Sequence, residues 1–292
     1  MDVNGLRLLL QDTPFAPRID EFQRSARHTI HLNRRIMEDE RIPIGATKLG
    51  GQPDLPPNFT WPERDGVPHA FLAQIRLEDV GPYDVEGLLP HAGRLYFFYG
   101  IAHEAAGFDP QDRGSWLVAY DDGHVSTLVR TAPPSELVAI SDDWGLNEGL
   151  FTACALDAAH ELTLPDRYSE HATGLAGHDE AIYEEVVEAA RREGERPLHQ
   201  LLGYPALVQN DMELECQLAS NGVFMGDGTW HNDPRSAELM AGESDWLLLL
   251  QVDTDTDADL QWGDEARLYY WIQRQALANN DFSNVWFVYQ SS

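Results

Sequence analysis

The sequence predicts an α+β fold, namely a β-rich single body built from two pseudo-symmetric repeats, with mostly antiparallel strands and a few peripheral helices. Three segments lead to this prediction. A Gly-Pro turn, an apolar strand interrupted by glutamine and an aromatic strand follow one another twice along the chain. The first repeat spans about residues 40–130 and the second about residues 198–290. Because no low-complexity linker separates them, we expect a single domain over residues 1–292.

The two repeats correspond segment by segment. The first contains residues 50–56, 71–75 and 93–99, and the second contains residues 202–207, 248–252 and 266–271. Gln74 and Gln251 interrupt the apolar strands at matching positions. A buried amide needs hydrogen-bond partners, so we expect each glutamine to hold the Gly-Pro turn of its own half. The alternative is that both glutamines, joined by Gln209, face each other across the pseudo-twofold axis and line a cleft.

Two helices are expected outside the repeats. Ile19, Phe22 and Ala26 recur at helical spacing, which predicts an N-terminal helix over residues 19–39. Acidic residues at the start and arginines at the end favour a second helix over residues 179–193, between the repeats. Both helices are therefore expected at the periphery of a strand-rich body.

The remaining elements are predicted as strands and loops. We expect strands over residues 70–77, 93–101, 115–121, 124–130, 246–252, 267–273 and 284–290. The run Asp121-Asp122-Gly123 suits a tight hairpin turn between two of these strands. Residues 150–164 alternate weakly and are compatible with a strand or a helix. Residues 208–244 form a loop insertion that only the second repeat contains.

The charge of the chain restricts its partners. The formal net charge is -29, and Lys48 is the only lysine. Such a field repels nucleic-acid backbones and anionic membranes, so we expect neither as a partner. It would accelerate association with a basic protein or a cation, although solubility alone also explains a charge of this kind.

The cysteines and the apolar segments indicate the compartment. Cys154 and Cys216 stand alone in apolar surroundings, which favours two buried thiols over a disulfide or a zinc site. The start of the chain lacks the basic leader and the apolar core of a signal peptide, and no stretch is long enough for a transmembrane helix. We therefore expect a cytoplasmic protein.

Several strings of the sequence resemble the YwqG-like family. These strings are residues 48–56, 61–62, 71–75, 201–205, 262–264 and 281–286, which agree in order over nearly the whole chain. The resemblance implies a bacterial, mostly cytosolic domain of unknown function that forms one β-rich α+β body with an internal duplication. It provides no catalytic residues to carry over. Members of the family resemble, by gene neighbourhood, proteins associated with toxin–immunity loci.

An acidic loop after the Gln251 strand has the spacing of a cation-binding loop. Aspartates stand at positions 1, 3, 5, 7 and 12 of this loop, as Asp253, Asp255, Asp257, Asp259 and Asp264. Clustered oxygen ligands at alternate positions suit calcium or magnesium. Against this stand an alanine at position 6, where an EF-hand needs glycine, and flanks that resemble strands. The alternative is a solvated acidic hairpin loop.

Three hypotheses for the function follow. We favour a non-catalytic binding protein whose acidic surface docks a basic protein partner, in the manner of the immunity proteins that the resemblance implies. The second hypothesis is a divalent-cation protein that uses residues 253–264. The third is an enzyme with an unrecognised site in the cleft between the repeats, although the chain has no nucleophile elbow, P-loop or kinase motif. The cleft candidates are Lys48, Trp61, Gln74, Gln209, Gln251 and Trp262.

Overall fold

The fold is organised around one large antiparallel sheet. The computed structural model describes residues 1–141, 146–192, 194–263 and 265–292. Within these residues a sheet of ten strands has the order β14-β13-β12-β11-β1-β10-β2-β6-β7-β8, and every neighbouring pair is antiparallel. The prediction of a β-rich α+β fold with mostly antiparallel strands is confirmed.

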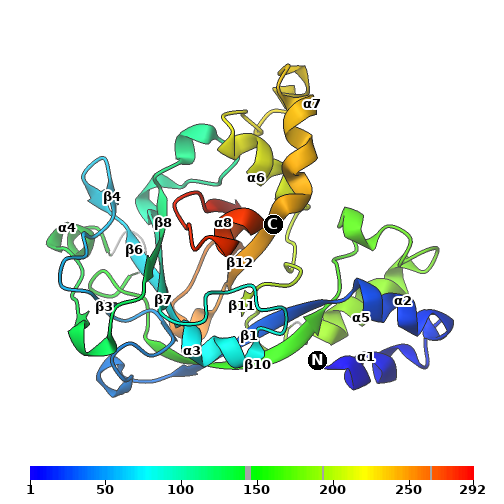
Figure 1. Cartoon of the computed structure of the whole chain (residues 1–292), viewed down its shortest axis with the longest axis horizontal. Coiled ribbons are helices and arrows are strands. Elements are labelled where there is room, and N and C mark those ends of the chain that lie inside the picture. Colours follow the sequence, from blue (N-terminus) through cyan, green and yellow to red (C-terminus); the bar gives the residue numbers. More distant parts are fainter. Residues whose placement is uncertain (142–145, 193, 264) are drawn as a thin grey trace.

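Two long strands form the centre of the sheet, and shorter strands extend it on both sides (Figure 1). The central strands are β1 (Arg27–Ile36) and β10 (Cys154–Thr163). One side continues with β2 (Lys48–Leu49), β6 (Ala70–Arg76), β7 (Arg94–Tyr99) and β8 (Trp116–Asp121). The other side continues with β11 (Gln200–Leu201), β12 (Trp246–Asp253), β13 (Arg267–Gln273) and β14 (Trp286–Gln290). Two small sheets pair β3 (Asp54–Leu55) with β9 (Val129–Arg130), and β4 (Glu63–Arg64) with β5 (Val67–Pro68).

The sheet curls until its two outer strands nearly meet (Figure 1). Where β8 approaches β14, the rings of Trp116 and Trp286 lie 5.0 Å apart. The Trp116 indole N–H donates to the carbonyl of Val285 at 2.9 Å, and the Trp286 indole N–H donates to that of Gly107 at 2.8 Å. Aromatic side chains thus close the seam where ladder hydrogen bonds end.

Short helices surround the sheet. They are α1 (Val3–Leu10), α2 (Ile19–Ser25), α3 (Leu77–Val80), α4 (Ser135–Ala139), α5 (Glu180–Arg191), α6 (Glu213–Ser220), α7 (Ser236–Leu239) and α8 (Arg274–Ala278). The helices α1, α2 and α5 form a separate small core in which Leu6, Phe22 and Tyr183 are fully buried. No helix among the described residues is long and apolar enough to cross a membrane.

Matching contacts hold the turn in each half. The Gln74 amide donates to the carbonyl of Ala46 at 2.8 Å and accepts from the backbone N–H of Asp54 at 2.8 Å. The Gln251 amide donates to the carbonyl of Leu198 at 2.6 Å and accepts from the N–H of Ala206 at 2.9 Å. Each glutamine therefore ties down the turn of its own half.

The tyrosine facing each glutamine repeats this agreement. Tyr96, paired with Gln74, donates its hydroxyl to the carbonyl of Asp54, and Tyr269, paired with Gln251, donates to that of Ala206. Register shifts also fall at corresponding places, between residues 71 and 73 and between residues 248 and 250. That the halves are two copies of one unit stays a prediction that these contacts support.

The predicted N-terminal helix over residues 19–39 is wrong in its second part. The helix α2 ends at Ser25, and residues from Arg27 onward form β1, the strand that pairs with both β10 and β11. Four consecutive residues at 29–32 are buried, because a central strand is covered on both faces and loses its alternating pattern. The spacing of apolar residues therefore imitated a helix.

The predicted hairpin across Asp121-Asp122-Gly123 is also wrong. The strand β9 pairs with β3 and not with β8. An ion pair of 2.9 Å between Arg130 of β9 and Asp54 of β3 stabilises this pairing. Residues 150–164 contain the strand β10, which settles that ambiguity. The helix expected over residues 179–193 is present as α5. The insertion at 208–244 is not a plain loop, because it contains α6 and α7.

Candidate functional site

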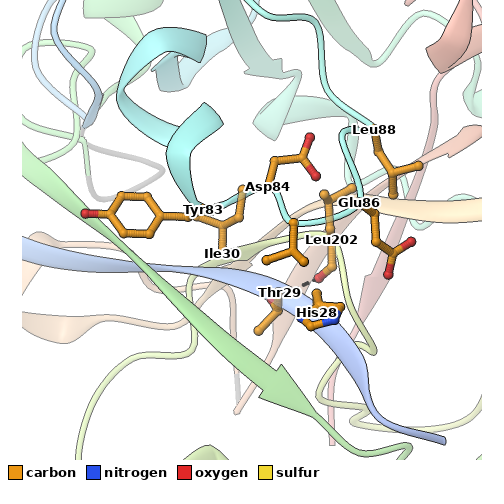
Figure 2. Close-up of a pocket in the computed structure, with 9 residues that line it drawn as sticks. His28, Thr29, Ile30, Tyr83, Asp84, Glu86, Leu88 and Leu202 are labelled. Carbon is orange, nitrogen blue, oxygen red and sulfur yellow. Dashed lines mark hydrogen bonds between the residues drawn. The ribbon is translucent and has the colours of Figure 1, made fainter. Parts of the chain in front are cut away.

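A groove lies where the two sides of the sheet meet over β1. Figure 2 shows its narrow end, between β1, the loop that follows α3 and the turn after β11. The residues that line this end are His28, Thr29, Ile30, Tyr83, Asp84, Val85, Glu86, Leu88 and Leu202. The neighbouring pocket of about 70 Å³ shares four of them and adds Arg27, Gly203, Leu247, Leu248 and Arg274. A wider groove of about 570 Å³ follows, between residues 87–92 and α8. We call these three connected depressions the junction groove.

Local hydrogen bonds hold the walls of the junction groove. The Thr29 hydroxyl donates to the carbonyls of Leu201 and Leu202, each at 3.1 Å. The Asp84 carboxylate accepts from the backbone N–H of Leu89 at 2.7 Å, which fixes the loop after α3. Leu202 adopts a left-handed backbone with φ of 61° although it is not a glycine. Such a backbone costs about 1–2 kcal/mol, so the surrounding contacts impose it.

Two histidines meet at the narrow end. The Nδ1 atom of His28 lies 2.7 Å from the Nε2 atom of His160 on the neighbouring strand β10. Burial and then the charge of His28 lower the pKa of His160. One ring of the pair therefore donates this hydrogen bond to the other, and His28 also lines the groove.

Sequence reasoning missed the junction groove. Arg27, Glu86 and Arg274 come from three distant segments, and no motif joins them. One signal was present in the repeats: Leu202 stands where the first repeat has Gly50. A bulky residue at the place of a turn glycine could have marked this position as unusual.

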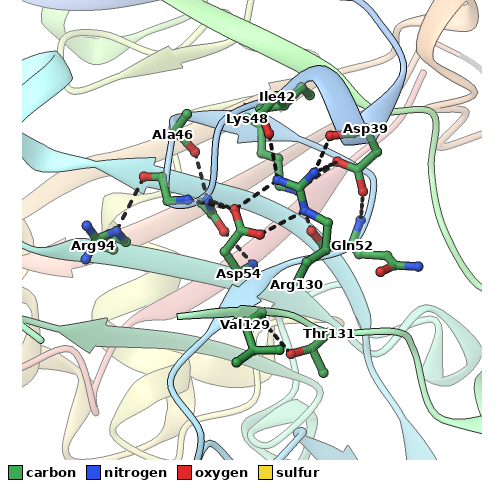
Figure 3. A network of polar contacts seen from close by, with 12 residues as sticks. Asp39, Ile42, Ala46, Lys48, Gln52, Asp54, Arg94, Val129, Arg130 and Thr131 are labelled. Atoms are coloured by element: carbon green, nitrogen blue, oxygen red, sulfur yellow. Dashed lines mark hydrogen bonds and ion pairs between the residues drawn. The ribbon is translucent and has the colours of Figure 1, made fainter. Parts of the chain in front are cut away.

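The predicted cleft residue Lys48 lies in a buried ion network (Figure 3). Its side chain is fully buried, and its ammonium donates to Asp39 at 2.9 Å and to the carbonyl of Gln52. Burial lowers the pKa of Lys48, while Asp54 and Asp39 oppose this shift. Burial would raise the pKa of Asp54, but Arg130 and Lys48 hold it below its usual value. The lysine is therefore paired inside the protein and helps to hold the turn.

The other cleft candidates do not converge on one site. Gln74 lies opposite Lys48 in the β2–β6 pair, and Gln251 lies opposite Gln200 in the other half. Trp61 is half-buried and donates to the carbonyl of His69 at 2.9 Å.

The remaining two candidates also sit apart from the junction groove. Trp262 is buried and donates to the carbonyl of Asp253 at 3.2 Å. Gln209 is exposed and donates to the carbonyl of Ser291 at 2.8 Å. None of the six candidates lines the junction groove.

Arginine side chains form ion pairs with carboxylates of the acidic loop. Asp253 pairs with Arg267 at 2.7 Å, and Arg34 on β1 pairs with both Asp255 and Asp257. The pKa of Asp255 would rise through burial, but His199 and Arg34 hold it below its usual value. Two arginines of the protein itself therefore offset part of the negative charge of this loop.

The remaining loop contacts bear on the cation hypothesis. Asp259 accepts from the hydroxyl of Thr152, and Asp264 lies outside the described residues. The Nδ1 atom of His199 accepts from the N–H of Asp253, so its proton sits on Nε2, facing Asp255 at 3.4 Å. Across the described part of the chain, no three histidine, cysteine or acidic side chains are grouped to hold a metal ion. The calcium or magnesium site stays a prediction.

An exposed aromatic pair stands apart from the junction groove. The rings of Phe108 and Phe224 lie 5.9 Å apart, and 40% and 39% of their surfaces are exposed. The N–H of Met225 donates to the carbonyl of Phe108 at 2.9 Å, which joins the β7–β8 connection to the insertion. Three aspartates flank the rings in sequence, and we call the whole set, Phe108, Asp109, Asp112, Phe224 and Asp227, the acidic aromatic surface.

The comparison with known families agrees with the extent of the sheet. The family described as “Domain of unknown function (DUF1963)” matches residues 47–291. No curated protein matches the chain. The match covers nearly all strands described above and leaves β1 and the first two helices outside it. The chain therefore belongs to the DUF1963 family, a domain of unknown function.

Proposed function

We propose that this protein is a non-catalytic binding protein that docks a basic, partly apolar protein segment on its acidic aromatic surface. The observation that carries this proposal is the exposed ring pair of Phe108 and Phe224, which three aspartates flank in sequence. Exposed aromatic pairs are enriched at protein interfaces, where they provide the buried centre of the contact. A negative rim steers a basic partner toward them.

The charges of the insertion support a basic partner. Acidic residues in segment 208–245 are Asp211, Glu213, Glu215, Asp227, Asp233, Glu238, Glu243 and Asp245. Its only arginine or lysine is Arg235, which pairs with Asp233 at 2.7 Å. Because acidic residues outnumber lysine and arginine in the whole chain as well, its net charge of -29 attracts a basic partner.

One carboxyl group couples docking to pH. Burial and then the neighbouring Asp112 raise the pKa of Glu215 to about 7. A cation docked beside Asp112 lowers this pKa again, so docking releases a proton. The affinity for a basic segment therefore increases as the pH rises through about 7.

The class of partner follows from the family resemblance. We infer that the DUF1963 match and the strings that resemble the YwqG-like family describe one family, whose members resemble proteins of toxin–immunity loci. A basic toxin domain would suit both the charge and the aromatic pair. Neutralisation by covering the surface of such a toxin requires no catalytic residue.

The probe is a synthetic amphipathic helix with lysines on one face and leucines on the opposite face. We expect it to bind by calorimetry and to lose about tenfold in affinity when salt is raised from low to physiological concentration. The double variant Phe108→Ser, Phe224→Ser should lose a further factor of about ten. The control Leu8→Ser changes an apolar residue that is 63% exposed on α1 and should bind normally.

Two results would contradict the proposal. Binding of the helix that does not respond to salt would show that the acidic charges are irrelevant. Equal affinity of the double variant and the Leu8→Ser control would show that the aromatic pair is not the docking surface. A helix with glutamate in place of lysine should not bind in either protein.

A further inference from the structure

We propose that the junction groove binds a small apolar carboxylate, with its charge held by Arg27 and Arg274 and its hydrocarbon chain against leucine side chains. This inference concerns a different face from the acidic aromatic surface and does not depend on the docking of a basic partner. It rests on two arginines left without carboxylate partners, on an apolar wall, and on a strained leucine that completes this wall.

Arg27 and Arg274 come from distant segments and line one pocket. Neither Arg27 nor Arg274 forms an ion pair with any residue that the structure describes, yet both line the same pocket of about 70 Å³. The guanidinium of Arg27 lies 4.0 Å above the ring of Tyr204, and this stacking orients Arg27 in the lining of the pocket. Arg274 begins α8 and is exposed. Two such donors in one pocket suit a carboxylate.

Apolar side chains cover the rest of this pocket. Leu88, Leu202, Leu247 and Leu248 line it, and the first two extend into the narrow end shown in Figure 2. Leu202 and Leu248 are buried, whereas Leu88 and Leu247 are half-buried. A ligand that carries only charge would leave the exposed parts of Leu88 and Leu247 in water. A short hydrocarbon chain attached to the carboxylate would instead be buried against them.

Leu202 connects this wall to backbone strain. It holds a left-handed backbone with φ of 61°, whereas Gly50 takes this conformation in the first half with φ of 58°. The Thr29 hydroxyl and the Gln200 amide both donate to its carbonyl, which keeps the turn in place. Residues with an unfavourable backbone conformation cluster at ligand sites. At such a site the strained backbone places a side chain where the ligand needs it.

The other charges in the junction groove define the ligand further. Glu86 lines the same pocket, and Asp84 lines the narrow end. Together with the net charge of -29, they oppose a doubly charged phosphate more than a singly charged carboxylate. The ring of His28 adds a hydrogen-bonding group to the same lining as Arg27. The lining therefore favours one negative charge on an apolar body.

The test is a titration with hexanoate, followed by the NMR signals of the His28 ring. We expect saturable shifts and an affinity at least about tenfold higher than that of hexanamide, which has the same chain without the charge. Arg274→Gln should lose about tenfold, and because this side chain is exposed the variant should keep its fold. Arg7→Gln is the matched control, since Arg7 is also exposed and lies on α1.

A second variant tests the apolar wall separately. Leu202→Gly should weaken hexanoate binding while leaving the much weaker binding of acetate unchanged, because acetate has no chain to bury. Equal binding of hexanoate and hexanamide, or unchanged hexanoate affinity in Arg274→Gln, would overturn the proposal. Tighter binding of inorganic phosphate than of hexanoate at the same ring signals would overturn the choice of ligand.

Discussion

In the first half, the turn after β2 is built on Gly50 and Gly51 around the buried charges of Lys48, whereas the second half builds its turn on Leu202 and Gly203 beside the neutral Gln200. The scaffold contacts agree in both halves, because each turn is held by a glutamine of the neighbouring strand. The two turns differ in what they contact. In the first half the turn packs against other backbone, and in the second half the turn lines the junction groove.

This comparison separates positions that the fold requires from positions that a ligand would require. A Cβ atom at Gly50 would lie 2.4 Å from the carbonyl oxygen of Thr152, so no side chain fits there. At position 202 a leucine side chain fits, although its backbone adopts an unfavourable left-handed conformation. The following variants test whether the two halves differ in this way, from the largest expected effect to the smallest.

Replacing the buried lysine should have the largest effect. Lys48→Met removes the cation beside Asp39 and leaves that carboxylate with the backbone N–H of Gln52 and the more distant Arg130, at 3.6 Å. Because an uncompensated buried charge is costly, we expect the free energy of unfolding to fall by about 3 kcal/mol. Gln200→Met, its counterpart, should cost about 1–2 kcal/mol, since only neutral hydrogen bonds are lost. Urea denaturation of both variants measures the difference, and equal losses would remove the contrast between the halves.

A methyl group at the glycine turn should come next. Gly50→Ala places a Cβ atom against the backbone of residues 151–152 in a left-handed conformation. We expect a loss of about 2–3 kcal/mol from strain and clash together. Gly66→Ala is a control for the backbone effect alone, because Gly66 has φ of 78° with nothing near its Cβ position. A thermal melt that shows the same loss for both would indicate that packing against residues 151–152 is unimportant.

The third effect depends on pH. The pKa of Glu215, on α6, is raised to about 7 by burial and by Asp112, so the folded state keeps a proton that the unfolded state releases at lower pH. Stability is therefore lost as the pH rises from about 4.5 to about 7. Glu215→Gln should remove this loss and add about 2 kcal/mol at pH 8, with no gain at pH 4. Chemical denaturation at both pH values measures it; a gain that does not vary with pH would mean the carboxyl is not protonated in the folded state.

Calcium should have the smallest effect. The carboxylates of Asp253 and Asp255 are engaged by Arg267 and Arg34, so a cation must displace these arginines before it binds. We expect millimolar calcium to raise the melting temperature by less than about 1 °C. In the variant Arg34→Gln, which frees Asp255 and Asp257, the shift should increase. A large shift in the unmodified protein would instead establish the acidic loop as a calcium site.

The sequence predicted the parts of the fold that local pattern controls. The strands at 70–77, 246–252 and 267–273 were found because each is a short run of apolar and aromatic residues, and the helix α5 was found from its helical spacing. The strand β1 was missed because Ile30 and Ile36 continue the apolar spacing of the preceding helix α2.

The candidate sites were harder to predict, because they depend on pairings between distant segments. Nothing local indicates that Arg130 pairs with Asp54, or that Arg34 reaches the acidic loop. The junction groove brings β1, the loop after α3 and α8 together, and the sequence contains no spacing that would place them. The one sign of the groove in the sequence is Leu202, which stands in the second repeat where the first repeat has Gly50.

The aromatic seam between β8 and β14 has a consequence for how the chain reaches its fold. The hydrogen bond from Trp116 to Val285 joins residues 169 positions apart, and the central pair of β1 with β10 is also distant in sequence. Such nonlocal contacts form late, because the entropy of closing the intervening chain must be overcome first. Until the seam closes, the backbone groups of β8 form an open edge that another unfinished chain can pair with. Refolding yield should therefore fall with protein concentration even though the finished molecule covers this edge with tryptophan.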